Sequence, residues 1–247
     1  MAAPPTRIAP RPVPRYRQAA DQLAQQITDG EVPAHSRLAS ERALADQFGL
    51  SRMTARQAVE LLVRRGLVYR RPGSGTFVSP PRVVHTLQRL AGFSEQMRAQ
   101  GIEPDGRVLD MELTADLDAE VRTALGLRRR QRAWLLRRIR FGDGEPLLLE
   151  TSFIPDAVCP GLGSHDMAKQ SLYDLMAASF GVRPVHAHET IEPATLEASD
   201  ARHLGTRPGS SAICVRRTAS TADRRPVEYA VDLYRGDRAR FEIDLRS

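Results

Sequence analysis

Residues 40–78 constrain the fold of this chain more than any other segment. Ser40 can cap a helix whose apolar residues recur at three- and four-residue spacing. Gly49 then supplies the left-handed backbone that a sharp reversal needs, and Ser51 can cap a second helix at once. The segment therefore predicts two helices joined by a tight turn.

The second of these helices combines an apolar stripe with a polar first turn. Helical spacing places the stripe on Ala55, Ala58, Val59, Leu62 and Val63. Arg52, Thr54 and Arg56 lie in or beside the first turn. In a helix-turn-helix protein this end of the second helix enters the major groove, where arginine pairs with two acceptors of guanine. The spacing thus predicts that this turn contacts DNA bases.

A hairpin follows the second helix. Strand-like runs over 67–71 and 76–79 flank Pro72-Gly73-Ser74-Gly75, whose composition is typical of a turn. The small tip suits a phosphate or the minor groove, whereas in the simpler interpretation the two glycines only form the turn. Because the hairpin comes directly after a helix-turn-helix pattern, we favour a DNA-binding wing.

Residues 14–78 resemble the DNA-binding domain of the GntR family of bacterial transcription regulators. The resemblance begins at Pro14-Arg15-Tyr16-Arg17-Gln18 and covers about a quarter of the chain. The chain departs from the family pattern at Ala39, where proline is usual, and at Ala55, where valine is common, which affects helix entry and packing. The resemblance implies DNA contacts at Arg42, Arg52, Thr54, Arg56 and Gly75.

Positive charge is concentrated in the first third of the chain. Residues 1–82 hold 13 Lys plus Arg against 6 Asp plus Glu, whereas residues 83–247 hold 23 against 24. This distribution suits a polyanionic partner for the first third only. Since Lys169 is the single lysine among the 36 basic residues, the abundance of arginine by itself carries little weight.

With 247 residues the chain can hold two domains, each with its own core. We predict a disordered arm over 1–13, a winged helix-turn-helix domain over 14–79, a linker over 80–86 that begins at Pro80-Pro81, and an effector-binding and dimerisation domain over 87–247. Cys159 and Cys214 give neither a disulfide framework nor zinc spacing, which fits a cytoplasmic protein. We expect no membrane segment, no metal and no cofactor.

The second domain mixes helices and strands. A helical pattern runs over 87–100, and short helices over 117–125, 171–180 and 196–204 each end before a glycine. Strand-like runs lie at 107–113, 133–141, 146–154, 185–191, 211–219, 226–235 and 239–245. This pattern predicts an α+β domain with a mostly antiparallel sheet.

Alternation gathers charged side chains on one side of three strands. Arg138 and Arg140 share a face, and so do Glu150 and Ser152. In the strand near 230, Glu228, Asp232 and Tyr234 lie opposite Val227, Tyr229, Val231 and Leu233. Spacing alone favours a solvated face with surface ion pairs. In the same way, His186 and His188 share a face, but no third ligand is identifiable, so we favour ordinary polar residues over a metal site.

The rest of the chain is similar to the effector-binding domain of the HutC subfamily of GntR regulators, called UTRA. The similarity rests on Gly92-Phe93-Ser94-Glu95 with Gly101, Arg138-x-Arg140, Pro146 to Glu150, Ser171-Leu172-Tyr173, Leu204-Gly205 and Glu228 to Arg238. It implies a chorismate-lyase-like α+β fold with effector contacts at Phe93, Ser94, Arg138, Arg140, Glu150, Ser171, Glu228 and Tyr234. Two arginines suit an anionic group, and two carboxylates suit hydroxyl or amino groups.

These features favour a transcription factor, most simply a repressor, that binds a palindromic DNA operator as a homodimer and responds to a small metabolite. One alternative is a ligand-independent repressor with a vestigial pocket. Another is an enzyme of lyase-like fold, for which the sequence offers no nucleophile, metal set or cofactor motif.

Overall fold

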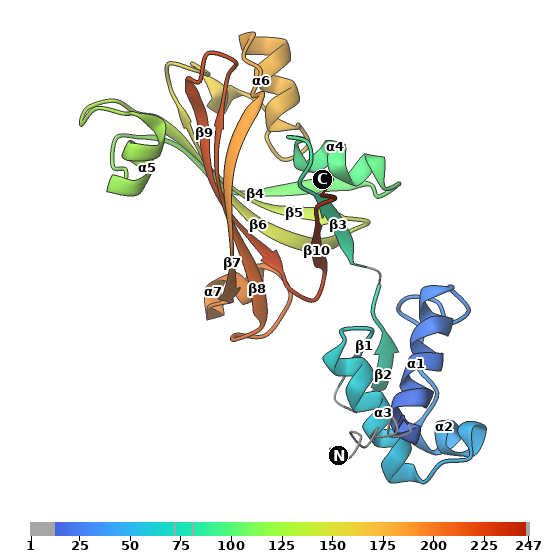
Figure 1. Cartoon of the computed structure of the whole chain (residues 1–247). Coiled ribbons are helices and arrows are strands. Elements are labelled where there is room, and N and C mark those ends of the chain that lie inside the picture. The colour runs from blue at the N-terminus through green and yellow to red at the C-terminus, as the bar shows by residue number, and fades with distance from the viewer. Residues whose placement is uncertain (1–12, 72, 81, 246–247) are drawn as a thin grey trace, which may run out of the picture. The chain divides into compact units, whose positions relative to one another are not determined.

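The chain divides into two compact units between residues 81 and 82 (Figure 1). The computed structural model describes residues 13–71, 73–80 and 82–245. Except for Val13, the predicted arm over 1–13 lies outside the described residues. Each unit has hydrophobic clusters of its own, with one in the first unit and the others in the second.

The first unit is the predicted winged helix-turn-helix. Its second and third helices begin where serines cap them: the Oγ atom of Ser40 accepts a hydrogen bond from the backbone N of Ala43 at 3.2 Å, and that of Ser51 accepts one from the backbone N of Thr54 at 3.1 Å. Gly49 ends the first of these helices with a left-handed φ of 60°. The elements are α1 (Arg15–Thr28), α2 (Glu41–Phe48), α3 (Arg52–Arg64), β1 (Val68–Arg71) and β2 (Gly75–Val78).

The apolar stripe of α3 forms the centre of this core. Four of the five predicted residues are buried, and Val63 is half-buried at the edge of the cluster. They pack against Leu44 of α2 and Leu23 of α1. The antiparallel strands β1 and β2 form the wing, which a bridge between Arg37 and Phe77 extends.

The predicted linker over 80–86 was too long. Val83–Thr86 forms strand β3, which pairs in parallel with β10 (Ala239–Glu242) in the second unit. Val83 is buried there. The partner strand lies about 150 residues away in the chain, so local composition gave no sign of the pairing. The helix expected over 87–100 is also shorter, because α4 begins only after Gly92 and spans Phe93–Ala99.

A six-stranded antiparallel sheet forms the body of the second unit, which confirms the predicted α+β class. The strand order is β4-β5-β6-β9-β8-β7. The strands are β4 (Pro104–Thr114), β5 (Ala133–Gly142), β6 (Glu145–Pro155), β7 (His186–Thr195), β8 (Ser211–Ser220) and β9 (Pro226–Arg235). The helices are α4, α5 (Ala119–Leu125), α6 (Leu172–Phe180) and α7 (Ala198–His203), with a short 3-10 turn at Leu162–Ser164.

Helices cover both faces of this sheet (Figure 1). Leu172 and Met176 of α6 pack on Leu136 of β5, on the face that also carries Arg138 and Arg140. The opposite face packs against α5 and α7 through two other clusters, one around Val121 and Leu125 and the other around Ala201 and Leu204. The charged residues on the α6 face of β5, β6 and β9 are therefore enclosed. The solvated face that spacing favoured was wrong, since Arg138 and Arg140 are each 2% exposed.

A β-bulge corrects one detail of the predicted alternation. Glu228 pairs with Ala219, and Pro226 pairs with Ser220. Val227 is therefore an extra residue of β9 that has no partner on β8. Alternation predicted that Val227 lies on the same face as Tyr229. Val227 instead packs in the cluster of Leu136 and α6. Glu228 remains on the same face as Asp232, because the bulge precedes both residues.

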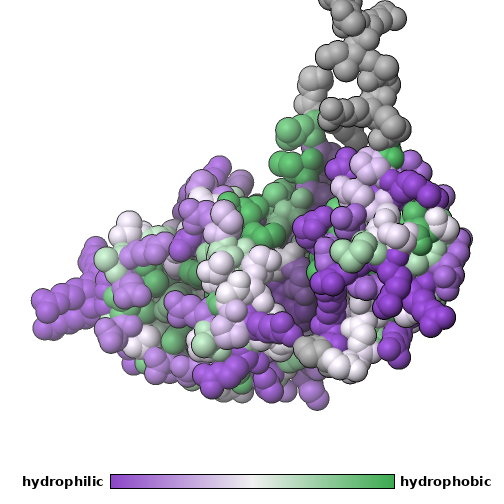
Figure 2. All heavy atoms as spheres, turned by 90° about the horizontal axis from the view of Figure 1, so that it is seen from below, coloured by the Kyte–Doolittle hydropathy of each residue, from purple (hydrophilic) through white to green (hydrophobic). Residues whose placement is uncertain are grey.

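Hydrophilic residues predominate on the face of the molecule shown in Figure 2. Within the residues that the structure describes, no helix has the length and apolar character needed to cross a membrane.

Candidate functional sites

The outer face of α3 carries unpaired basic side chains. Arg52 is exposed in the first turn of α3, and Arg42 is exposed on α2. Neither guanidinium makes a hydrogen bond or an ion pair with another described residue. Met53, next to Arg52 in the chain, is 65% exposed. Exposed cationic groups without internal partners can bind an external anion or base edge at no cost in broken protein contacts.

The other two predicted α3 contacts have internal partners. The Nε atom of Arg56 lies 3.1 Å from the Oε1 atom of Glu60, one turn along the helix. The hydroxyl oxygens of Thr54 and Ser51 are 2.8 Å apart, which orients Thr54 at the helix start. The pair of Arg56 is largely exposed, so exchanging Glu60 for another acceptor costs about 1 kcal/mol or less.

The wing glycine Gly75 has a backbone reason to be glycine. Its φ is +114°, and a Cβ atom there would lie 2.9 Å from the Nε atom of Arg37. Arg71, at the other side of the turn, lies over the rings of Tyr69 and Phe77 at 5.4 and 5.1 Å from their centroids. Arg37 and Arg71 are thus cationic groups of the wing that sequence analysis missed, although Arg71 directly precedes the turn motif.

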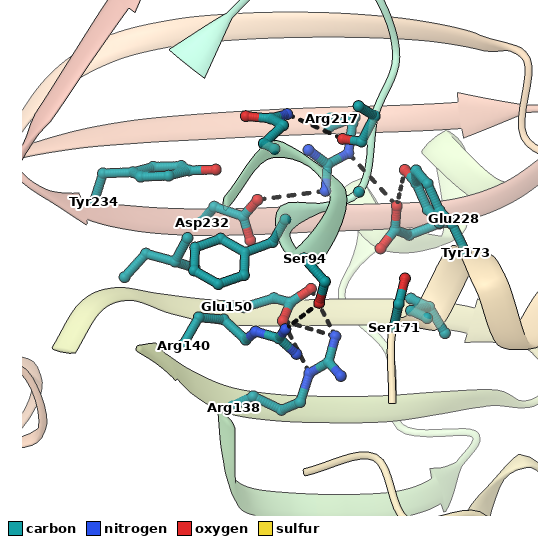
Figure 3. A pocket seen from close by; sticks show the side chains of 16 residues that line it. Ser94, Arg138, Arg140, Glu150, Ser171, Tyr173, Arg217, Glu228, Asp232 and Tyr234 are labelled. Carbon is teal, nitrogen blue, oxygen red and sulfur yellow. Dashed lines mark hydrogen bonds and ion pairs between the residues drawn. The ribbon is translucent and has the colours of Figure 1, made fainter. Parts of the chain in front are cut away.

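In the second unit, the structure brings all eight predicted effector residues to one pocket (Figure 3). They come from elements that are far apart in the chain, namely α4, β5, β6, the start of α6 and β9. The pocket is lined by Ala91, Gly92, Phe93, Ser94, Gln96, Arg138, Arg140, Leu148, Glu150, Ser171, Leu172, Tyr173, Arg217, Glu228, Asp232 and Tyr234. Its free volume of about 30 Å³ has room for about two water molecules.

One arginine of the pocket is fully paired. The Nε and Nη2 atoms of Arg138 donate to the two carboxylate oxygens of Glu150 at 2.9 and 3.0 Å, and its Nη1 atom donates to the carbonyls of Met167 and Gln170 at 2.8 and 3.1 Å. Burial alone would raise the pKa of Glu150, but the charges of Arg138 and Arg140 bring it below its usual value. Glu150 is therefore a carboxylate at neutral pH.

A second arginine, Arg217 of β8, is shared among three acids. It lies 3.4 Å from Glu189, 3.5 Å from Glu228 and 3.4 Å from Asp232. Burial raises the pKa of Asp232 to about 8, and its Oδ1 atom has no hydrogen-bond partner among the described residues. Burial therefore favours the protonated form of Asp232, against the charge of Arg217.

The third arginine, Arg140, lacks an ionic partner. Its Nη2 atom donates to the Oγ atom of Ser94 at 2.8 Å, and its guanidinium lies 4.8 Å from the ring centroid of Phe93. The Nε and Nη1 atoms are buried without a partner among the described residues. Burial lowers the pKa of Arg140 to about 10, so the group still carries its charge at neutral pH.

These pairings leave one positive charge of the pocket without a carboxylate partner among the described residues. Arg138 is paired with Glu150, and Arg217 lies within 3.5 Å of Glu189, Glu228 and Asp232. The uncompensated charge is on Arg140. A buried cation of this kind is stabilised by a bound anion.

The sequence patterns did not predict Arg217, Tyr173 and Gln96 as pocket residues, and they placed Asp232 only on a shared strand face. Alternation in the strand over 211–219 separates Arg217 from Arg216, but only the strand pairing shows which of them faces the pocket. Tyr173 was visible in the Ser171-Leu172-Tyr173 motif. It donates a hydrogen bond to Glu228 at 2.7 Å.

Two family descriptions match the chain. Residues 15–78 match "Bacterial regulatory proteins, gntR family", and residues 99–240 match "UTRA domain". The chain belongs to the GntR family and carries a UTRA domain. This confirms both resemblances, and it makes the protein a DNA-binding transcription regulator rather than an enzyme. The pocket residues Phe93 and Ser94 precede the matched part of the UTRA domain.

Relatives and solved structures agree with this assignment over almost the whole chain. The HTH-type transcriptional repressor NagR of Bacillus subtilis (strain 168) is 35% identical, over 93% of this chain and 94% of its own. The histidine utilization repressor of Pseudomonas putida is 29% identical, over 94% and 92%. The crystal structure of PhnF from Mycobacterium smegmatis has a TM-score of 0.66 at 28% identity, and the match covers 93% of this chain and 99% of that one.

Proposed function

We propose that this GntR regulator is a cytoplasmic, homodimeric repressor that binds a palindromic operator and that a small anionic metabolite in the UTRA pocket changes its operator affinity. The repressor role follows the names of the relatives NagR and histidine utilization repressor. The two-fold symmetry of a dimer matches a palindrome, because each recognition helix then meets an equivalent half-site.

The first unit supplies the DNA contacts in this proposal. Arg42 and Arg52 are exposed and have no internal partner among the described residues, so they are available to bases or phosphates. Thr54 and Arg56 complete the contact surface at the start of α3, and Gly75 keeps the tip of the wing small. Binding of this kind weakens steeply as the salt concentration rises.

Arg140 carries the effector part of the proposal. It is 2% exposed, retains its charge at neutral pH and has no carboxylate partner among the described residues. Arg138 and Ser94 lie on either side of the same space, and Glu150, Ser171, Glu228 and Tyr234 offer acceptors and donors for hydroxyl or amino groups. An organic anion satisfies this set better than a neutral molecule does.

The effect on operator affinity requires only a modest coupling energy. A tenfold change in affinity corresponds to about 1.4 kcal/mol of coupling between the two sites. An anion that pairs with Arg140 in one arrangement of the pocket and not in another supplies this difference. The direction of the change decides whether the metabolite releases the repressor or strengthens its binding.

Operator binding by Arg52→Ala tests the DNA part. We expect a loss of about 1–3 kcal/mol per half-site together with relaxed base preference at the contacted position. Arg64→Ala is the matched control, since Arg64 is exposed on the last turn of the same helix. Fluorescence anisotropy with operator and mutated duplexes measures both quantities. A variant Arg52→Ala that keeps the wild-type preference would contradict the assignment of α3 as the reading helix.

A thermal-shift screen of anionic metabolites tests the effector part, with Arg140→Met as the control protein. We expect a compound that stabilises the wild type, leaves Arg140→Met unchanged and alters operator affinity. The ligand-independent repressor has one observation in its favour, because internal contacts leave only about 30 Å³ free in the pocket. Operator binding that no anionic compound alters would favour that alternative.

A further inference from the structure

A second and larger cavity adjoins the anion pocket. Its volume is about 430 Å³, within the usual range for sites that hold small organic molecules. Four residues line both spaces, namely Ala91, Gln96, Arg217 and Tyr234. We call the larger space the side groove. These shared residues place the side groove directly beside the anion pocket.

The side groove has polar and apolar lining residues, and its apolar part includes side chains of β7 and β8. Ala187 and Ile191 of the edge strand β7 pair with Ala219 and Val215 of β8, and they face the same side of the sheet as Arg217. Ile191 is 40% exposed, which is high for isoleucine. An apolar surface that stays exposed next to a polar pocket is typical of a ligand-binding groove.

The opposite wall contains His85 and Phe241, whose rings stack with centroids 5.1 Å apart. The amide N of Gln96 donates to the carbonyl of Ala91, so its oxygen is left to accept from Nδ1 of His85 at 2.9 Å. Burial lowers the pKa of His85 to about 4. At neutral pH His85 is therefore uncharged, and with Phe241 it adds aromatic surface to this wall.

The junction between the two spaces is polar. The hydroxyl of Tyr234 makes no hydrogen bond with any residue in the described ranges, and Arg217 lies beside it with Glu189 at 3.4 Å. These groups suit a hydroxyl, amide or ether that links an acidic head to an apolar body. The anion pocket alone has too little free space for such a body.

We propose that the effector is a two-part organic anion, with an acidic group at Arg140 and an apolar or aromatic body in the side groove. This inference rests on the proposed function and specifies the class of effector. It distinguishes such molecules from small acids and simple phosphorylated metabolites, which fill the anion pocket and leave the groove unused.

Two probes with the same acidic group test the proposal by isothermal titration calorimetry of the intact protein. Methyl phosphate reaches only the anion pocket, whereas 1-naphthyl phosphate adds an aromatic body. We expect the naphthyl compound to bind the wild type at least about tenfold more tightly, as burial of a large apolar group predicts.

Ala187→Trp fills the side groove from an exposed position on β7. We expect this variant to bind both probes with affinities within about threefold of each other and to keep the wild-type affinity for methyl phosphate. Thr195→Trp is the matched control, because Thr195 is exposed on the same strand and the same face but lies outside the groove. It should keep the naphthyl preference. Ile191→Asp, at a second exposed groove position, should lose it without adding bulk.

The outcomes separate the two proposals. Equal binding of both probes to the wild type, or an intact naphthyl preference in Ala187→Trp and Ile191→Asp, would overturn the two-part effector. A dimer that dissociates in Ala187→Trp during sedimentation would instead assign the groove to a second copy of the chain, which also overturns it. Unchanged binding of methyl phosphate to Arg140→Met would overturn the proposed role of Arg140 itself.

Discussion

Arg138 and Arg140 provide a matched pair for measuring how ion pairing alters the cost of a buried charge. They lie two residues apart on β5, face the same pocket and are equally buried at 2% exposure. Arg138 has a two-point pair with Glu150, whereas Arg140 has no carboxylate partner among the described residues. Replacing each by methionine keeps most of the side-chain volume and removes the charge.

The two substitutions should have opposite effects on stability. Arg138→Met leaves Glu150 as a buried carboxylate without its main partner, which costs about 3–5 kcal/mol. Arg140→Met removes a cation whose pKa burial lowers to about 10. At about 1.4 kcal/mol per pKa unit, that charge destabilises the fold by about 3 kcal/mol at neutral pH.

Arg140→Met also loses favourable contacts. The hydrogen bond to Ser94 and the stacking on Phe93 contribute about 1 kcal/mol each, so the net change is a gain of about 1 kcal/mol. The two variants should therefore differ by about 4–6 kcal/mol in unfolding free energy. Arg140→Met should lose effector binding while its stability stays unchanged or improves. Arg138→Met should instead be destabilised.

Urea unfolding of the intact protein measures this difference. Trp134 is the single tryptophan and packs in the core of the second unit, so its fluorescence reports on that unit alone. Asp156→Asn is the control, because it breaks the more exposed pair with Arg132 and should cost about 1 kcal/mol or less. Equal destabilisation by Arg138→Met and Arg140→Met would refute the reasoning that pairing decides the cost.

Two further predictions concern Asp232 and the wing. Burial raises the pKa of Asp232 to about 8, so the folded state holds the proton of Asp232 more tightly than the unfolded chain does. The stability that this proton contributes is fully present below about pH 4 and is lost as the pH rises to about 8. Asp232→Asn should flatten the fall in urea midpoint between about pH 4 and 8, and an unchanged slope would count against the assignment. In the wing, Gly75→Ala should weaken operator binding more than Gly73→Ala does, because a Cβ at 75 meets Arg37 at 2.9 Å whereas one at 73 meets nothing within 4 Å. Equal losses in a binding titration would show that backbone strain alone matters.

Local sequence determined the helix-turn-helix and the hairpin of the DNA-binding unit. Ser40, Gly49 and Ser51 act through hydrogen bonds and backbone angles within a few residues, so their positions predict the helix ends directly. In the second unit, alternation along single strands likewise placed Arg138 with Arg140 and Glu228 with Asp232. Such patterns depend only on neighbours in the chain, and for that reason they can be read without a structure.

The tertiary structure decided which of these faces is enclosed and which strands meet. The pairing of β3 with β10 turned part of a predicted linker into a strand, and the bulge at Val227 moved that residue to the other core. The register of β8 against β9 brought Arg217 beside Asp232, and the helices over the sheet buried Arg140 without a carboxylate partner among the described residues. Pairing between distant strands and the packing of helices on them set burial, and burial in turn set the charges of the pocket.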